Sequence, residues 1–297
     1  MSYICPFNQS TTDDQGLSIP QMLETQAKRA PDAIAIAAPG RPPLTYRRLC
    51  DHIDYVVKTL NSMGLGRGDR VAIVLPNGPE MAVAFLAVAA GATSAPLCPA
   101  YLANEFELYL SDLNAKALII RSGMDSPAIA VAQRHGLSIL ECTPVLEGDA
   151  GIFSLRGDQR SPVAGANGRP LLPGFARPDD VALVLHTSGT TSRPKIVPLT
   201  HTNICASAHN IQVTLELTEK DRCLNIMPLF HIHGLIGAIV SSLAVGASVV
   251  CTPGCDVTRF FKWMEAFHPT WYTAVPTMHQ TILTRADSNR DIVARFP

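Results

Sequence analysis

Residues 181–195 read VALVLHTSGTTSRPK, and this stretch contains the features that decide the fold. Val181 to Leu185 is a continuous apolar run of strand length, which is typical of a strand buried on both faces. Small hydroxyl residues around one glycine follow directly, and a helical pattern begins near Thr200–Thr202. A buried strand, a polar loop and a helix in this order predict an α/β fold.

The rest of the chain repeats this alternation of strand-length and helix-length segments. We expect strands at Val71–Leu75, Thr93–Leu97, Ala117–Ile120, Val181–Leu185, Cys223–Met227, Ser248–Cys251 and Trp271–Val275. We expect helices at Met81–Ala90, Asn104–Leu113, Thr202–Val213, Leu235–Val245 and Val257–Phe267. Continuous apolar strands separated by helices indicate a mainly parallel sheet covered on both faces.

A weak internal repeat relates residues 69–97 to residues 221–251. Each copy begins with Asp-Arg, continues through a five-residue run to a proline, and ends an apolar helix at Gly-Ala before the next strand. We interpret this as two similar α/β subdomains in tandem. The alternative is chance recurrence of a common helix–glycine–strand unit.

The length of 297 residues agrees with about two domains. We place the first subdomain in residues 1–175 and the second in residues 176–297. The first includes a connecting region, from about residue 141 to 180, that is rich in Gly, Pro, Arg and Asp. This region is expected to hold loops and a few short strands.

Composition excludes several classes of protein. Hydrophobic residues make up 47% and charged residues 16% of the chain, which is enough apolar material for a large core and too little charge for a disordered chain. The net charge of −1 makes nucleic acid or an anionic membrane surface an unexpected partner. Eight scattered cysteines without a C-x-x-C pair indicate reduced thiols, and the N-terminus has no signal-peptide pattern, so we expect a cytoplasmic location.

One uncharged stretch, residues 234–255, has the length of a membrane span. Glycines, serines and a proline interrupt it. It is therefore better interpreted as a buried helix at Leu235–Val245, stopped by Gly246, and a short strand.

The hydroxyl-rich loop has the chemistry of a phosphate-binding site. Phosphate oxygens need many short donors, which hydroxyls and the backbone N–H groups of a tight glycine turn supply. The lysine that follows adds a point charge. Because Pro194 precedes Lys195, the segment is not the Gly-Lys-Ser/Thr loop of kinases and GTPases. An ordinary Ser/Thr-rich loop is the plainer alternative. The candidate phosphate-binding residues are Thr187, Ser188, Gly189, Thr190, Thr191, Ser192 and Lys195.

The segment 187–195 resembles the ATP-phosphate loop of the adenylate-forming superfamily, which comprises acyl-CoA synthetases, luciferases and adenylation domains. Residues 227–234 (MPLFHIHG) and 271–277 (WYTAVPT) match further landmarks in order and spacing, and the resemblance runs along nearly the whole chain. Segment 186–195 is most similar to the oxalate–CoA ligase branch. Ser192 and Ile196 stand where most of the superfamily has glycine.

The resemblance implies an acid–CoA ligase that uses ATP, Mg²⁺ and coenzyme A. It implies that Lys195 and the loop hold the phosphates, that Thr190 helps to bind Mg²⁺, and that His231 lies beside the reacting carboxylate. His233 and residues Val275, Pro276 and Thr277 are expected to line the acid pocket. Motifs of the superfamily's later part do not occur before Pro297. We therefore expect an N-terminal piece without the C-terminal domain and with little turnover of its own, and any peroxisomal signal would lie beyond it.

Other functions remain open. Three histidines, His231, His233 and His279, hint at a polar pocket for a small carboxylic acid such as oxalate rather than a fatty acid. Two histidines at His-x-His spacing do not by themselves make a zinc site. An adenylation domain that loads a carrier protein, and a nucleotide-binding chain without turnover, are the alternative functions.

Overall fold

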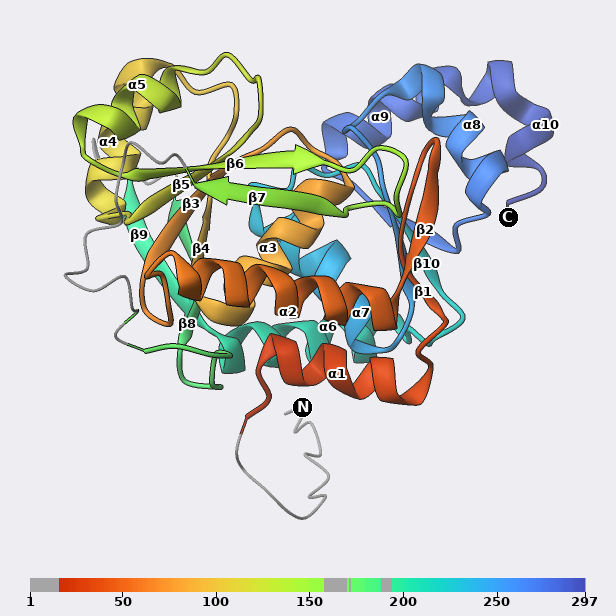
Figure 1. Ribbon diagram of the computed structural model, residues 1–297. Helices are drawn as coiled ribbons and strands as arrows, with labels where there is room; N and C mark the ends of the chain where they lie inside the picture. Colours follow the sequence, from red (N-terminus) through yellow and green to blue (C-terminus); the bar gives the residue numbers. More distant parts are fainter. Residues whose placement is uncertain (1–15, 158–169, 171, 188–193, 297) are drawn as a thin grey trace, which may run out of the picture.

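The computed structural model describes residues 16–157, 170, 172–187 and 194–296. Figure 1 shows strands at the centre, α4 and α5 on one side, and α8, α9 and α10 on the other. The strands are β1 (Ile34–Ala38), β2 (Arg41–Thr45), β3 (Arg70–Val74), β4 (Thr93–Pro96), β5 (Ala117–Arg121), β6 (Ser138–Pro144), β7 (Phe153–Gly157), β8 (Val181–Thr187), β9 (Lys195–Thr200), β10 (Arg222–Asn225), β11 (Ser248–Cys251) and β12 (Trp271–Thr273). The helices are α1 (Ile19–Arg29), α2 (Tyr46–Ser62), α3 (Pro79–Gly91), α4 (Ala103–Leu113), α5 (Pro127–Arg134), α6 (His201–Leu215), η1 (His233–Val240), α7 (Ser241–Ala244), α8 (Val257–Phe267), α9 (Pro276–Ala286), η2 (Asp287–Asn289) and α10 (Arg290–Val293).

These strands form two sheets. The seven-stranded sheet has the order β7-β6-β5-β3-β4-β8-β9, and the five-stranded sheet has the order β12-β10-β11-β1-β2. All central pairings are parallel, whereas the outer pairs β6–β7, β8–β9 and β1–β2 are antiparallel. The predicted α/β fold with mainly parallel sheets is confirmed.

Alternating side chains divide the core into layers. In β3, Val71 and Ile73 point into the central core between the sheets, while Ala72 and Val74 pack with Phe106 of α4 on the outer face. In β10, Cys223 likewise belongs to the central core, while Leu224 packs with Phe260 of α8 on the outer face. Because side chains alternate along a strand, each sheet buries both faces, which explains the continuous apolar runs.

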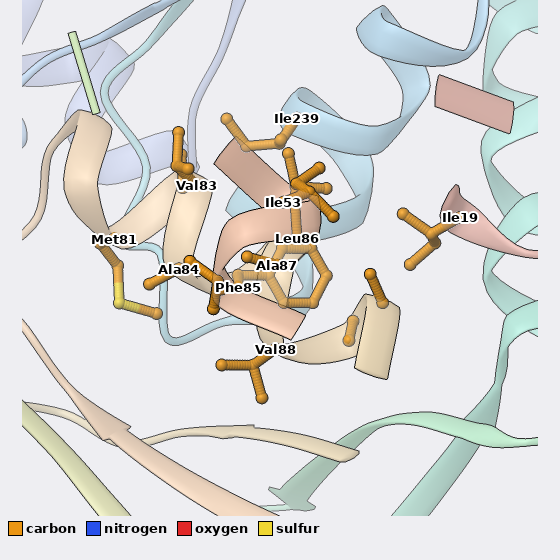
Figure 2. Close-up of a cluster of buried hydrophobic side chains, with 14 of the residues drawn as sticks. Ile19, Ile53, Met81, Val83, Ala84, Phe85, Leu86, Ala87, Val88 and Ile239 are labelled. Carbon is orange, nitrogen blue, oxygen red and sulfur yellow. The ribbon is translucent and has the colours of Figure 1, made fainter. Parts of the chain in front are cut away.

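Helix α3 fills the centre of the molecule. Every residue from Met81 to Gly91 is buried, and the helix contacts strands of both sheets. Figure 2 shows Ile19 of α1, Ile53 of α2 and Ile239 of η1 converging on it. A helix that is apolar on all sides requires such surroundings.

The internal repeat of the sequence is a structural repeat. In the first copy β3 pairs with β4 on one side and with β5 on the other, and in the second copy β10 pairs with β11 and β12 in the same way. Equivalent backbone bonds recur: Thr93 N donates to Asp69 O at 2.9 Å, and Ser248 N donates to Asp221 O at 3.1 Å. The tandem similarity predicted from the sequence is therefore confirmed.

The two sheets exchange strands across residue 175. The β1–β2 hairpin joins the five-stranded sheet beside β11, and the β8–β9 hairpin joins the seven-stranded sheet beside β4. Each sheet thus contains strands from both halves of the chain. The division into residues 1–175 and 176–297 stays a prediction, which separate expression of the halves would test.

The helix expected at Leu235–Val245 differs from the prediction. A π-helix, η1, begins at His233 and passes into the short α7, after which Gly246 turns the chain with a φ of 85°. Tertiary contacts hold its first turn: a Cβ on Gly234 would lie 2.5 Å from the Pro228 carbonyl oxygen, so only glycine permits this approach. The strand expected to follow is β11. Among the described helices, none is both long and apolar enough to cross a membrane.

Candidate active site

The β8–β9 hairpin carries the candidate phosphate loop. Thr187, the last residue of β8, and Lys195, the first of β9, are direct partners across the hairpin. Lys195 is exposed at this position. The chain then enters α6, whose N-terminus is capped by the Thr200 hydroxyl. Ser188, Gly189, Thr190, Thr191 and Ser192 lie outside the described residues, so their roles stay predictions.

A pocket of about 260 Å³ opens beside this hairpin. The end of β4 contributes Pro96 and Leu97, β8 contributes His186 and Thr187, and the third wall is the segment 230–233 that follows β10. The pocket therefore lies where carboxyl ends of strands from both sheets meet, which is the usual position of a ligand site in α/β folds.

His231 lines this pocket. Its side chain is exposed, and its ring centroid lies 4.4 Å from that of Phe230. Partial desolvation by the surrounding protein lowers the pKa of His231 below the ordinary histidine value. The imidazole is therefore mainly neutral at neutral pH, and its N–H can donate a hydrogen bond to a carboxylate.

His233 is held by the neighbouring strand. Its Nε2 lies 2.6 Å from the Thr273 hydroxyl oxygen at the end of β12. This contact joins the first turn of η1 to the five-stranded sheet. His233 also lines the pocket, but one of its two nitrogens is already engaged.

Val275 is the N-cap of α9, and Pro276 and Thr277 are the first residues of this helix. They do not line the pocket described above, and Pro276 and Thr277 are exposed. Their role in acid binding stays a prediction. His279, a residue of α9, does not line the pocket either: its Nδ1 lies 3.0 Å from the Tyr272 hydroxyl oxygen.

Sequence reasoning missed an aromatic wall built on His186. The His186 ring meets Tyr109 edge-on at 4.6 Å, and Tyr109 stacks on Tyr101 at 4.8 Å. Burial lowers the pKa of His186, while the charge of Asp112 partly opposes this shift. The position of His186 at the end of the predicted strand was the available signal, because such residues face a ligand site in parallel sheets.

Ile196 occupies a regular strand position opposite His186 and packs with the outer core. Among the described non-glycine residues, positive φ occurs at Asn114, Glu216 and His268, so Ile196 needs no left-handed conformation. The loss of a family glycine there causes no backbone strain. Ser192 lies outside the described residues.

The described residues do not themselves fit a divalent cation. No group of three or more His, Cys, Asp or Glu side chains suited to a metal occurs among them. Thr190, the expected contributor to Mg²⁺ binding, lies outside the described residues.

Comparison with known proteins identifies the family. The model of the AMP-binding enzyme family matches residues 23–294. The chain belongs to the AMP-binding enzyme family. The β8–β9 hairpin and the pocket beside it are thus features of an AMP-binding enzyme chain.

Similar members of this family include oxalate–CoA ligases. The chain is 42% identical to oxalate–CoA ligase of Arabidopsis thaliana over 272 residues, covering 90% of this chain and 52% of that protein. It is 38% identical to oxalate–CoA ligase of Saccharomyces cerevisiae over 285 residues, covering 87% and 52%. The crystal structure of apo MatB from Rhodopseudomonas palustris superposes with a TM-score of 0.72 at 25% identity, covering 90% of this chain and 51% of that one. The chain thus spans about half the length of the curated relatives that it matches.

Proposed function

We propose that this chain belongs to an acid–CoA ligase that acts on a small dicarboxylic acid, with oxalate as the first candidate. In the first step a carboxylate oxygen attacks the α-phosphorus of ATP, an acyl-AMP forms and pyrophosphate leaves. In the second step the thiol of coenzyme A attacks the acyl carbon, loses its proton and displaces AMP. Neither step needs a covalent bond to the protein, so the protein contributes positioning and charge stabilisation.

The observation that carries the proposal is the meeting of two features at one pocket. Thr187, Val197 and Leu199 of the β8–β9 hairpin line the same pocket as His231, and Lys195 pairs directly with Thr187 at the loop end of this hairpin. In the proposal Lys195 and the intervening hydroxyls hold the ATP phosphates. His231 donates a hydrogen bond to the acid, so the carboxylate is oriented toward the α-phosphorus.

The choice of a small polar acid rests on the pocket lining. His186, His231 and His233 line a volume of about 260 Å³ together with apolar residues such as Leu97 and Val197, and these three imidazoles are the side chains that would hydrogen-bond a small acid. The names of the similar ligases support oxalate. Val275, Pro276 and Thr277 complete the acid site in this proposal, and ATP, Mg²⁺ and coenzyme A are its co-substrates and cofactor.

The test is AMP release by the product of the whole gene, because the chain spans half the length of its relatives. AMP would be measured with ATP, coenzyme A and either oxalate, malonate, acetate or hexanoate. The proposal expects strong dependence on oxalate and on coenzyme A. Oxalate-dependent adenylation that needs a carrier protein instead would favour an adenylation domain, and no AMP with any acid would leave a nucleotide-binding protein without turnover.

A further inference from the structure

Asn77 connects the two sheets at the end of the molecule where the pocket lies. It sits in the short loop between β3 and α3. Its Oδ1 accepts a hydrogen bond from Leu229 N at 2.8 Å, and its Nδ2 donates to the Thr252 carbonyl oxygen at 3.0 Å. The loop therefore belongs to the seven-stranded sheet, while both partners follow strands of the five-stranded sheet.

The partners of Asn77 belong to a buried polar network. Thr252 is fully buried, and its hydroxyl donates to the Asn225 carbonyl oxygen at 2.9 Å. The side chain of the fully buried Asn225 accepts from Met227 N at 3.2 Å. Leu229 and Met227 are thus each anchored through their backbone N–H, two residues apart, just before His231. Gly234 then packs against Pro228 from the other side.

This arrangement matters because the pocket has walls from both sheets. The walls at Leu97 and His186 belong to the seven-stranded sheet, whereas His231 follows β10 of the five-stranded sheet. Movement of one sheet relative to the other would change the distance from His231 to the phosphate hairpin. Since a displacement of about 1 Å can cost 100-fold in rate, a fixed link at this end has a functional consequence.

We propose that Asn77 is a positioning residue that holds the 227–231 segment, and with it His231, in register with the phosphate-binding side of the pocket. Asparagine suits this role because its planar amide offers an acceptor and a donor at fixed geometry. The acceptor serves Leu229 N and the donor serves the Thr252 carbonyl oxygen. The chemical role of His231 rests on the proposed function. The effect of Asn77 on the position of His231 is independent of that function.

The test is a substrate-free NMR titration of the chain. The imidazole signals of His231 would be followed against pH by proton–carbon correlation in the wild type and in Asn77→Ala. Loss of the link frees the 227–231 segment, so the amide signal of Leu229 should shift and His231 should titrate closer to the ordinary pKa of about 6.5. In the described pocket the other titratable groups that face His231 are His186, His233 and Tyr101, and none is acidic.

Asn61→Ala is the matched control. Asn61 also accepts one backbone bond, from Gly174 N at 2.7 Å, and donates one, to Leu65 O at 3.0 Å, but none of these residues lines the pocket. The Asn61→Ala substitution should lower the melting temperature without changing the pKa of His231. Should Asn77→Ala fail to fold, Asn77→Ser, whose hydroxyl is too short to reach both partners, gives the same readout.

An unchanged His231 titration, in an Asn77 variant whose Leu229 amide signal shows that the bond is lost, would overturn the proposal. Because the titration uses no acid, nucleotide or coenzyme A, its outcome is independent of whether the protein proves to be an acid–CoA ligase. If acid-dependent AMP release is found, Asn77→Ala should lower kcat for the acid, and Asn61→Ala should not.

Discussion

Thr187 and Lys195 face each other across the β8–β9 hairpin, as the last and first residues of its two strands. The hydroxyl-rich segment between them is therefore closed at its base by paired strands. The pairing holds Lys195 next to Thr187, which lines the same pocket as His231. In the proposed function, this pairing is what keeps the exposed Lys195 close to the bound nucleotide.

Replacing Lys195 by alanine should weaken ATP binding. A charge-assisted contact to phosphate contributes about 1.5–3 kcal/mol, so the dissociation constant should rise about 10- to 100-fold. Calorimetric titration of ATP would measure it, with Lys220→Ala as the control because Lys220 is also exposed but precedes β10. Equal affinity of the Lys195 and Lys220 variants would contradict the assignment.

Replacing His231 by alanine should reduce use of the acid while leaving stability nearly unchanged, because the side chain is exposed. Loss of one hydrogen bond to a carboxylate predicts a fall of about 10- to 100-fold in kcat/KM for the acid. The measurement is acid-dependent AMP release, and exposed His209 supplies the control substitution to alanine. A His231 variant that retains full acid activation would remove this residue from the site.

Replacing Thr273 by valine removes the hydroxyl bonded to His233 and keeps the shape of the side chain. We expect a loss of about 1 kcal/mol in the free energy of unfolding and a higher KM for the acid. Urea unfolding and steady-state kinetics would measure these effects. Thr214→Val, which removes an exposed bond to Asn210 O within α6, should leave KM unchanged; a KM rise in both variants would show that the effect is not local.

Two buried histidines should make the fold sensitive to acid. Burial lowers the pKa of His52 and of His201 to about 4, from an ordinary value of 6.5. Below about pH 6.5 these two imidazoles bind protons in the unfolded chain but stay neutral in the folded chain. Stability that is complete above that pH is therefore lost progressively down to about pH 4, by up to about 3 kcal/mol for each group.

Urea unfolding at several pH values tests this expectation. His52→Phe removes one titrating group from a site already lined by Phe153 and Tyr55, so the dependence of unfolding free energy on pH should become shallower. His209→Gln, at an exposed position, is the comparison. An identical pH dependence in wild type and His52→Phe would show that His52 is not held neutral.

The elements predicted from the sequence are those whose signal is local and repeated. The strand at Ser248–Cys251 and the helix at Val257–Phe267 have the predicted bounds. The elements that were missed include helices α1, α2, α5 and α9 and strands β1, β2, β6 and β9. Helix α1 carries a capping box from Ser18 to Gln21, a signal that was available in the sequence.

Other features depend on contacts that no local pattern contains. The exchange of β1–β2 and β8–β9 between the sheets is decided by which edges are free, and the π-helical start of η1 by packing against Pro228 and Thr273. Of the residues named from the sequence as site candidates, Thr187, His231 and His233 line one pocket, and their roles stay predictions. The aromatic wall of His186 and the bridge of Asn77 join residues far apart in sequence, so no local pattern announces them.

The most direct test of the central claim is exchange of radiolabelled pyrophosphate into ATP, because it reports acid adenylation before coenzyme A takes part. The product of the whole gene would be assayed with oxalate and, separately, with hexanoate. The account predicts rapid exchange with oxalate, far slower exchange with hexanoate, and loss of the oxalate signal in His231→Ala but not in His209→Ala. Exchange supported by hexanoate and not by oxalate, or by neither acid, would contradict it.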